Sequence, residues 1–106
     1  MLEYTHLHNY SNTSLGRYTD TSGNYNLRMF YNNFEVSRID IWRSARYAQF
    51  FEYLDRKGGV LLRRWGDAPI RTLSLAALFP NLKIQQWPGL CYDHTGLRLT
   101  SFTEFW

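Results

Sequence analysis

Residues 63–79 read RRWGDAPIRTLSLAALF, and the second half of this stretch has the pattern of an amphipathic helix over 68–79. The apolar residues that can share one helical face are Ile70, Leu73, Ala77 and Leu78. Asp67 is predicted to be the N-cap, because a side-chain oxygen there accepts a hydrogen bond from a free backbone N–H. Pro69 fits the first turn, where a missing N–H costs nothing, and Pro80 ends the helix.

Asp67 has two interpretations. In the structural one it only caps a helix, as Asp commonly does. In the functional one it is a site carboxylate, held in its ionised form by the partial positive charge of the helix start. The preceding residues support the second interpretation: Gly66 lets the backbone approach a ligand closely, and Arg64 and Trp65 present a cation and a flat apolar face.

A second helix is predicted over 44–57. The residues that follow the i, i+3, i+4, i+7 spacing are Tyr47, Phe50, Phe51 and Leu54. Ser44 is the expected N-cap. Gly58 and Gly59 end the helix, because one of them can adopt the left-handed conformation.

Three strands are predicted around these helices. Residues 27–36 (LRMFYNNFEV) are dense in aromatics, 60–62 form a short apolar run, and 82–87 read LKIQQW. The alternation of strand and helix favours an α/β fold. Asn32 and Asn33 are poor strand residues, so a bend is expected just before Glu35.

Residues 1–26 are polar and show little periodicity, which predicts a loop or a loosely attached arm. His6 and His8 would share one face of a strand. Because no third ligand is nearby, exposed histidines are the preferred interpretation over a metal pair.

The composition is that of one small globular domain of 106 residues. Aromatics make up 18% of the chain, more than a core of this size needs, so some rings are expected to line a surface or pocket. Residues 36–72 hold eight basic and four acidic side chains. That balance suits a phosphate-bearing partner but is too mixed in sign to indicate nucleic acid. The sequence has no stretch near the ~20 apolar residues of a membrane helix and no signal peptide.

Three residues from the ends of predicted elements are candidates for chemistry: Glu35, Asp67 and His94. Two carboxylates and a histidine there would suit a polar site at one edge of an α/β sheet. Each also has a structural interpretation, as a solvated loop carboxylate, a helix cap and a structural histidine respectively. The phosphate-loop patterns GxGxxG and GxxxxGK[ST] do not occur.

Several pieces of the sequence, in register, resemble the fungal α-1,2-mannosyltransferases of glycosyltransferase family 15, the glycolipid 2-α-mannosyltransferases. These pieces are NFE (33–35), RS (43–44), Tyr47, FF (50–51), LD (54–55), GG (58–59), RWGDAP (64–69) and the Y-x-H of Tyr92 and His94. The resemblance extends from about residue 25 to residue 94. RWGDAP after a helix that ends in Gly-Gly is its most specific part.

The resemblance implies a Rossmann-like, metal-dependent GT-A fold, of which this chain would be the carboxy-terminal part. It implies transfer of mannose from GDP-mannose to a mannose 2-hydroxyl, with retention of the α configuration, in protein glycosylation. The family acts in the Golgi as membrane proteins that build mannans of the fungal cell wall. Its anchor and targeting segment would lie outside this chain.

The resemblance also implies roles for single residues. Glu35 would lie beside the reacting sugar carbon, as nucleophile or as ion-pair partner of an oxocarbenium-like transition state. Asp67 would orient or deprotonate the acceptor hydroxyl. His94 would bind Mn²⁺, which neutralises the leaving diphosphate. The donor- and acceptor-binding residues would be Asn33, Arg64, Trp65, Gly66 and Tyr92.

We therefore expect a polar, poorly ordered arm over 1–24, a partial catalytic domain over 25–95 and a diverged tail over 96–106. The family's acidic metal motif would belong to an amino-terminal half that this chain lacks. The main alternative is a non-catalytic fragment that binds sugar or nucleotide, with Trp65 and Trp87 as stacking platforms. A basic, aromatic nucleic-acid binder is the third hypothesis.

Overall fold

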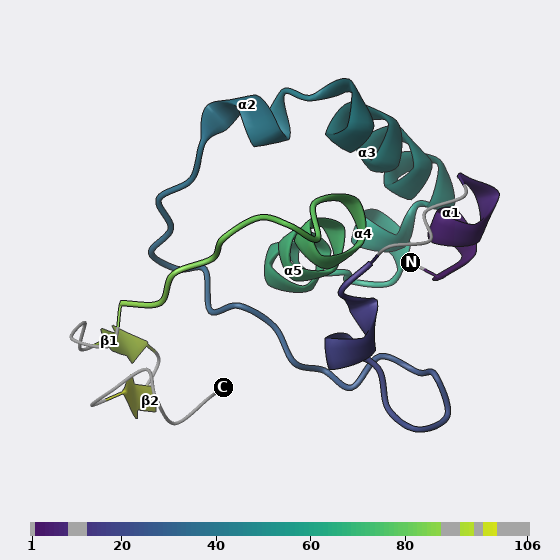
Figure 1. The fold of residues 1–106 in the computed structure, drawn as a ribbon. Helices are drawn as coiled ribbons and strands as arrows, with labels where there is room; N and C mark the ends of the chain where they lie inside the picture. Colours follow the sequence, from purple (N-terminus) through teal and green to yellow (C-terminus); the bar gives the residue numbers. More distant parts are fainter. Residues whose placement is uncertain (1, 9–12, 88–91, 95–96, 100–106) are drawn as a thin grey trace.

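The computed structural model describes residues 2–8, 13–87, 92–94 and 97–99, and most of its regular structure is helical (Figure 1). The elements in chain order are α1 (Leu2–Leu7), the 3-10 helix η1 (Leu15–Tyr18), α2 (Ile39–Trp42), α3 (Ala45–Lys57), α4 (Gly59–Leu62), α5 (Asp67–Leu78), β1 (Tyr92–His94) and β2 (Leu97–Leu99). The two strands form an antiparallel pair in which Tyr92 lies opposite Leu99. In the described part of the chain, no helix is both long and apolar enough to cross a membrane.

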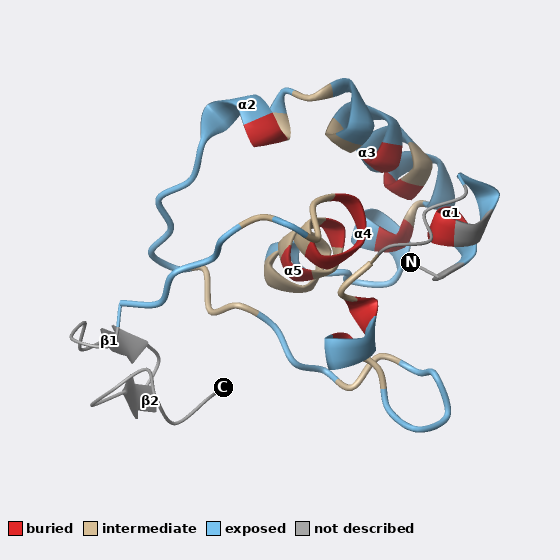
Figure 2. Cartoon of the chain, in the orientation of Figure 1, coloured by how far each residue is buried: buried red, intermediate tan, exposed pale blue. Residues whose placement is uncertain are grey.

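Helix α5 lies at the centre of the helical body, and most residues on its buried face are small (Figure 2). The buried residues of α5 are Thr72, Ser74, Ala76, Ala77 and Leu78. The other buried members of the core are Tyr4, Leu15, Tyr18, Phe50 and Leu54. Short side chains on α5 let these neighbours pack close to its backbone, at the density that a protein core requires.

The carboxyl end of α5 binds two distant segments through its backbone carbonyls. Pro80 has no N–H, so the carbonyl of Ala76 lacks its usual donor four residues on. The backbone N–H of Ser14 donates to that carbonyl instead, at 2.8 Å. The guanidinium of Arg46 on α3 donates to the carbonyl of Leu78 at 2.7 Å. Both carbonyls are therefore satisfied, although each belongs to a buried residue.

Segment 27–36 crosses α5 as irregular chain, so the strand predicted there is wrong. Its anchor is the backbone N–H of Phe30, which donates to Oγ1 of Thr72 at 2.8 Å. The strand predicted over 60–62 is also wrong, because these residues belong to α4. Residues 82–87 have no regular structure. A strand needs neighbouring strands, and the helical body offers none. The α/β fold of the GT-A type stays a prediction.

The two predicted helices are confirmed. In α3, Oγ of Ser44 accepts a hydrogen bond from the backbone N–H of Tyr47 at 3.2 Å, and Gly58 ends the helix with a left-handed φ of 65°. Phe50 and Leu54 are buried as predicted. Phe51 is 55% exposed, so it lies at the edge of the buried face of α3.

The loose arm predicted over 1–24 is wrong for the residues of α1 and η1. Tyr4 is fully buried and packs edge-on against Phe50 of α3, with ring centroids 5.2 Å apart. Leu15 and Tyr18 of η1 are also in the core. These apolar residues are scattered among polar ones without helical periodicity, which hid them from sequence analysis.

In the connection between α4 and α5, the chain turns back so that it packs against Gly59. Arg64 adopts the left-handed region with φ of 55°, and the next residue, Trp65, donates its backbone N–H to the carbonyl of Gly59 at 3.1 Å. The indole ring then covers Gly59 so closely that a Cβ atom there would overlap it. Any side chain at this position would therefore have to displace the indole.

We expect Gly59→Ala to lower the free energy of unfolding by roughly 1–3 kcal/mol, because the added methyl overpacks the contact with Trp65. Gly16→Ala is the matched control, since a Cβ at Gly16 meets no atom within 4 Å. Both variants restrict the unfolded chain equally, so their difference isolates the native contact. Denaturant unfolding followed by circular dichroism measures it, and equal stability of the two variants would contradict the close packing.

Candidate functional site

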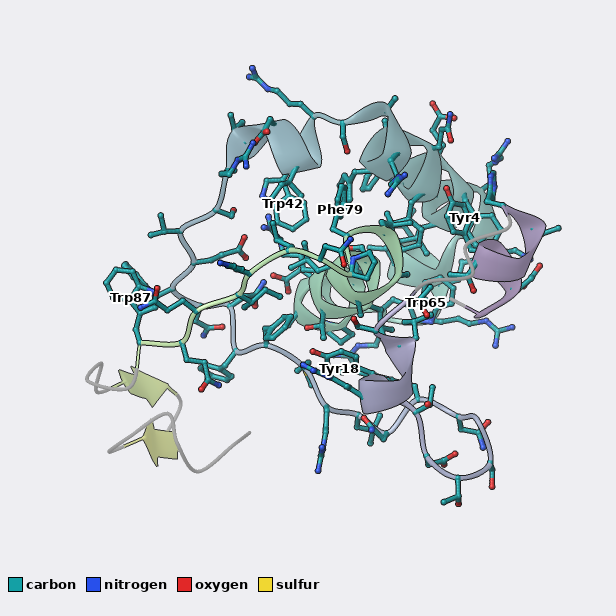
Figure 3. The ribbon with its side chains drawn as sticks, viewed as in Figure 1. Tyr4, Tyr18, Trp42, Trp65, Phe79 and Trp87 are labelled. Atoms are coloured by element: carbon teal, nitrogen blue, oxygen red, sulfur yellow. The ribbon has the colours of Figure 1, made fainter. Side chains whose placement is uncertain are left out.

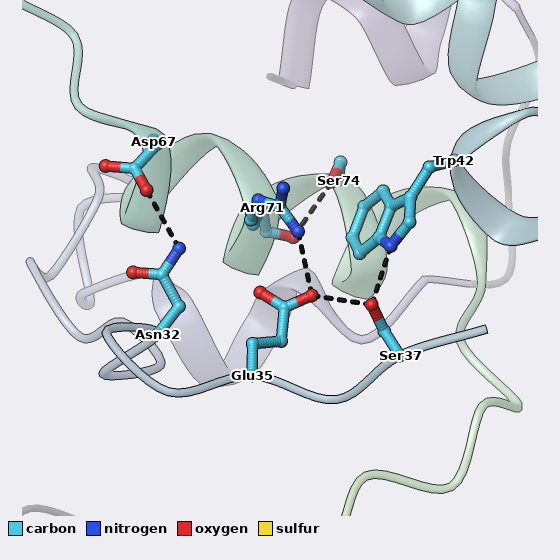
Figure 4. A network of polar contacts seen from close by, with 7 residues as sticks. All are labelled: Asn32, Glu35, Ser37, Trp42, Asp67, Arg71 and Ser74. Carbon is cyan, nitrogen blue, oxygen red and sulfur yellow. Dashed lines mark hydrogen bonds and ion pairs between the residues drawn. The ribbon is translucent and has the colours of Figure 1, made fainter. Parts of the chain in front are cut away.

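The two predicted site carboxylates lie along the exposed side of α5, in its amino-terminal half (Figure 4). Asp67 and Arg71 are four residues apart on this helix, so they share one face. The irregular chain that follows Phe30 runs along that face. Asn32 bonds Asp67 and Glu35 bonds Arg71. The structure thus places Glu35 and Asp67 side by side along α5, from segments far apart in the sequence.

Asp67 is the first residue of α5, and Gly66 is the N-cap, so the predicted N-cap role of Asp67 is wrong by one residue. Its Oδ2 accepts a hydrogen bond from Nδ2 of Asn32 at 3.0 Å. This bond is the main cause that lowers the pKa of Asp67. Burial opposes this bond and is the second-largest effect on the pKa, while the backbone N–H groups at the helix start and the charge of Arg71 lower the pKa by smaller amounts. Asp67 is therefore ionised at neutral pH, and it is a weak base.

Glu35 is held by a ring of side chains and is not a freely solvated loop carboxylate. Its Oε1 accepts hydrogen bonds from Nη1 of Arg71 at 2.7 Å and from Oγ of Ser37 at 2.8 Å. Oγ of Ser37 accepts in turn from Nε1 of Trp42 at 2.8 Å. The guanidinium carbon of Arg71 lies 4.6 Å from the centroid of the Trp42 ring. The side chains of Glu35 and Arg71 remain 27% and 37% exposed, so a ligand can reach them.

The other predicted binding residues lie on either side of these carboxylates. Asn33 is exposed in the segment that carries Glu35. Arg64 and Gly66 are exposed in the connection between α4 and α5. Trp65 rests on Gly59 and keeps 40% of its surface exposed. Figure 3 shows that Trp65 and Trp87 lie on different parts of the surface, so the two rings do not make one platform.

Tyr92 and His94 lie in β1, but their side chains are outside the described part of the structure. Their predicted roles in binding and in metal ligation stay predictions. His6 and His8 do not share a strand face, because helix α1 includes His6 and ends just before His8, and His8 is exposed as preferred. Among the described residues, no three or more His, Cys, Asp or Glu side chains cluster as a metal ion requires.

Sequence analysis did not assign a site role to Asn32, Ser37, Trp42 or Arg71. The only local signal for any of them is the four-residue spacing of Asp67 and Arg71, which puts both on one helical face. The other contacts join separate segments or depend on how the chain bends after Asn33, and neither is encoded in a local pattern.

Comparison with known proteins gives a consistent result. The family model of glycolipid 2-alpha-mannosyltransferases matches residues 2–105, a longer stretch than the resemblance found from motifs. The chain is 38% identical over 86 residues to alpha-1,2 mannosyltransferase KTR1 of Saccharomyces cerevisiae. The aligned stretch covers 80% of this chain and 22% of that protein. The chain is 40% identical over 76 residues to glycolipid 2-alpha-mannosyltransferase 2 of Candida albicans, covering 72% and 16%. No solved structure matches significantly.

We expect Asn32→Ala to raise the pKa of Asp67 toward its ordinary value of 3.8, because Asn32 is the main cause of the lowered value. Carbon-13 NMR titration of the Asp67 carboxylate measures the change. Asn24→Ala is the control, since Asn24 lies in an exposed turn away from the site.

The same change alters the acid sensitivity of the fold. A lowered native pKa stabilises the protein above pH 3.8, and this stabilisation is lost as pH falls through the native pKa. The stability gap between Asn32→Ala and the control should therefore shrink below pH 3.8. An unchanged Asp67 titration in Asn32→Ala would refute the assignment.

Proposed function

Because this chain belongs to the glycolipid 2-alpha-mannosyltransferase family, we propose that it carries part of the active site of a retaining α-1,2-mannosyltransferase. The donor would be GDP-mannose and the acceptor the 2-hydroxyl of a mannose in a glycan. The chain spans between 16% and 22% of the length of the relatives compared above. The observation that supports the proposal best is the placement of two accessible carboxylates, Glu35 and Asp67, along one face of α5.

Glu35 is suited to act at the anomeric carbon. In the described part of the chain its Oε2 accepts no hydrogen bond, so this oxygen can face C1 of the donor sugar. In a two-step reaction Oε2 forms a bond to C1, while the bond from C1 to the phosphate oxygen breaks and its electron pair leaves with GDP. The acceptor 2-oxygen then attacks C1, the bond from C1 to Oε2 breaks with its electron pair returning to the Glu35 carboxylate, and the acceptor proton passes to Asp67 late in this step. Two inversions give net retention.

In the other retaining route the acceptor attacks from the face that GDP leaves. Glu35 would then stabilise the oxocarbenium-like sugar through its negative charge, with no bond to C1. Both routes need an ionised carboxylate close to C1, and both fit the accessible position of Glu35.

Asp67 is suited to orient the acceptor hydroxyl. Its lowered pKa makes it a weak base, so accepting a hydrogen bond from the 2-hydroxyl fits it better than removing that proton early. Holding the nucleophilic oxygen in place removes much of the entropic cost of the reaction. The surrounding contacts to donor and acceptor would come from Asn33, Arg64, Trp65, Gly66 and Tyr92.

The metal belongs to the proposal through the family resemblance. Mn²⁺ would be bound by His94 and would neutralise the charge of the leaving diphosphate. The described side chains do not fit a manganese site by themselves, because they include no cluster of suitable ligands. The GT-A fold, the Golgi location and membrane association through an anchor are likewise proposals from the family.

The alternative is a non-catalytic domain that binds sugar or nucleotide. It is favoured by the exposed, edge-on pair of Phe34 and Trp87, whose ring centroids lie 6.3 Å apart, since such rings stack on sugars. Binding of GDP or mannosides that does not depend on Mn²⁺, without transfer, would support this alternative.

We expect mannosyl transfer from GDP-mannose to α-methyl mannoside, in the presence of Mn²⁺, to fall about 10³-fold or more in Glu35→Gln. In Asp67→Asn we expect a loss of about 10²-fold, because only the orientation of the acceptor is impaired. The control is Glu52→Gln, which changes an exposed carboxylate on α3. Product analysis by NMR reports the linkage and the anomeric configuration.

Calorimetric titration of the same protein with GDP-mannose, with and without Mn²⁺, separates binding from turnover. Transfer that is unchanged in both site variants would refute the roles of Glu35 and Asp67. If the folded chain shows neither binding of GDP-mannose nor transfer of mannose, the proposed function is refuted for this chain.

A further inference from the structure

We propose that Ser37, Trp42 and Arg71 form a clamp that positions the carboxylate of Glu35 so that Oε2 is the reacting oxygen; this rests on the proposed function. These three residues are the Glu35 clamp. They act through Glu35 and are not proposed to touch substrate.

The clamp is a closed ring of contacts in which Trp42 is used twice. Its indole N–H donates to Oγ of Ser37 at 2.8 Å, and the face of its ring supports the guanidinium of Arg71 at 4.6 Å. Ser37 and Arg71 then both donate to Oε1 of Glu35. One rigid side chain therefore fixes both donors, and a charge-assisted bond is among the stronger ways to fix a carboxylate.

The clamp binds one side of the carboxylate only. Both donors reach Oε1, and Oε2 receives no hydrogen bond from the part of the chain described here. Figure 4 shows Oε2 on the side of Asn32 and Asp67, away from Trp42. The donors therefore make the two oxygens of Glu35 different, and the oxygen left for chemistry faces the carboxylate proposed to hold the acceptor.

The clamp is attached to the core, which makes it rigid. Arg71 lies on α5, and Trp42 ends α2 and packs edge-on against Tyr47 of α3 with ring centroids 5.0 Å apart. Tyr47 is half-buried, and it packs against the hydrophobic core. Glu35 and Ser37 lie on irregular chain, so they obtain their precision from these helices. A site carried by a loop needs such support to keep its geometry.

The test uses the transfer assay with the single variants Ser37→Ala, Trp42→Phe and Arg71→Met. We expect kcat to fall about 10-fold in the first two and up to about 10²-fold in Arg71→Met, with KM within about twofold of wild type. Arg71→Lys should recover part of the loss, because it keeps a charge near Oε1 but not the planar stacking. Ser22→Ala and Arg56→Met, both at exposed positions, are the matched controls.

The double variant Ser37→Ala/Trp42→Phe gives the sharpest result. Phenylalanine keeps a ring face for Arg71 but removes the indole N–H, so both single changes break the same link. The double variant should therefore be no slower than the slower single variant. Multiplied losses would show that Ser37 and Trp42 act independently, and that result would overturn the clamp.

A structural measurement keeps the clamp testable whether or not the chain is active. In the ¹⁵N–¹H spectrum, the indole N–H of Trp42 should exchange slowly in wild type and faster in Ser37→Ala. Rapid exchange in folded wild type would overturn the clamp. An active wild type whose clamp variants keep full kcat would overturn the positioning role and leave the proposed function intact. A wild type that is inactive but keeps a protected indole would refute the proposed function and with it the reacting role of Oε2, while the contacts of the clamp would stand.

Discussion

The close approach of other segments to the buried side of α5 is the constraint on which this fold depends. Ser14 and Phe30 donate backbone N–H groups to α5, and Arg46 donates its guanidinium to the last turn. An unsatisfied buried polar group costs about 1–3 kcal/mol, so these contacts are as important as the apolar core. The small residues of the buried face let these segments come close, and Pro80 leaves the carbonyl of Ala76 open for Ser14.

The same helix sets the geometry of the candidate site. Thr72 binds Phe30 on the buried side, while Arg71, one residue earlier, points to the other side and binds Glu35. The position of the hydrogen bond between Phe30 and Thr72 therefore determines where the following residues, Asn32 and Glu35, reach the helix. A change in the core around α5 would therefore move the site carboxylates as well as lower stability, because the core contacts and the site contacts are made by the same helix.

Sequence reasoning worked where the information is local. The helices α3 and α5, the N-cap Ser44 and the terminating glycine Gly58 depend on single segments, and each is found within one residue of its predicted place. The predicted apolar face of α5 is only partly right, because Ala77 and Leu78 are buried whereas Ile70 and Leu73 are half-buried. Sequence reasoning failed where the outcome depends on partners. The apolar run in α4 suggested a buried strand, yet Leu61 is 86% exposed, because hydrophobicity alone cannot say what covers a residue. Glu35 and Asp67 were found through their motifs, whereas the contacts that hold them join segments by tertiary packing.

The motif RWGDAP illustrates why a structural and a catalytic interpretation need not compete. Arg64 turns the chain, Trp65 covers Gly59, and Gly66 is the N-cap of α5, so the motif builds the helix start at which Asp67 lies. The side chain of Asp67 is then available to bind Asn32 and remains exposed. Because the structural residues precede the carboxylate directly, the position of Asp67 is coupled to their packing. The motif therefore uses the backbone turn of its first three residues, Arg64 to Gly66, to place the exposed charge of Asp67.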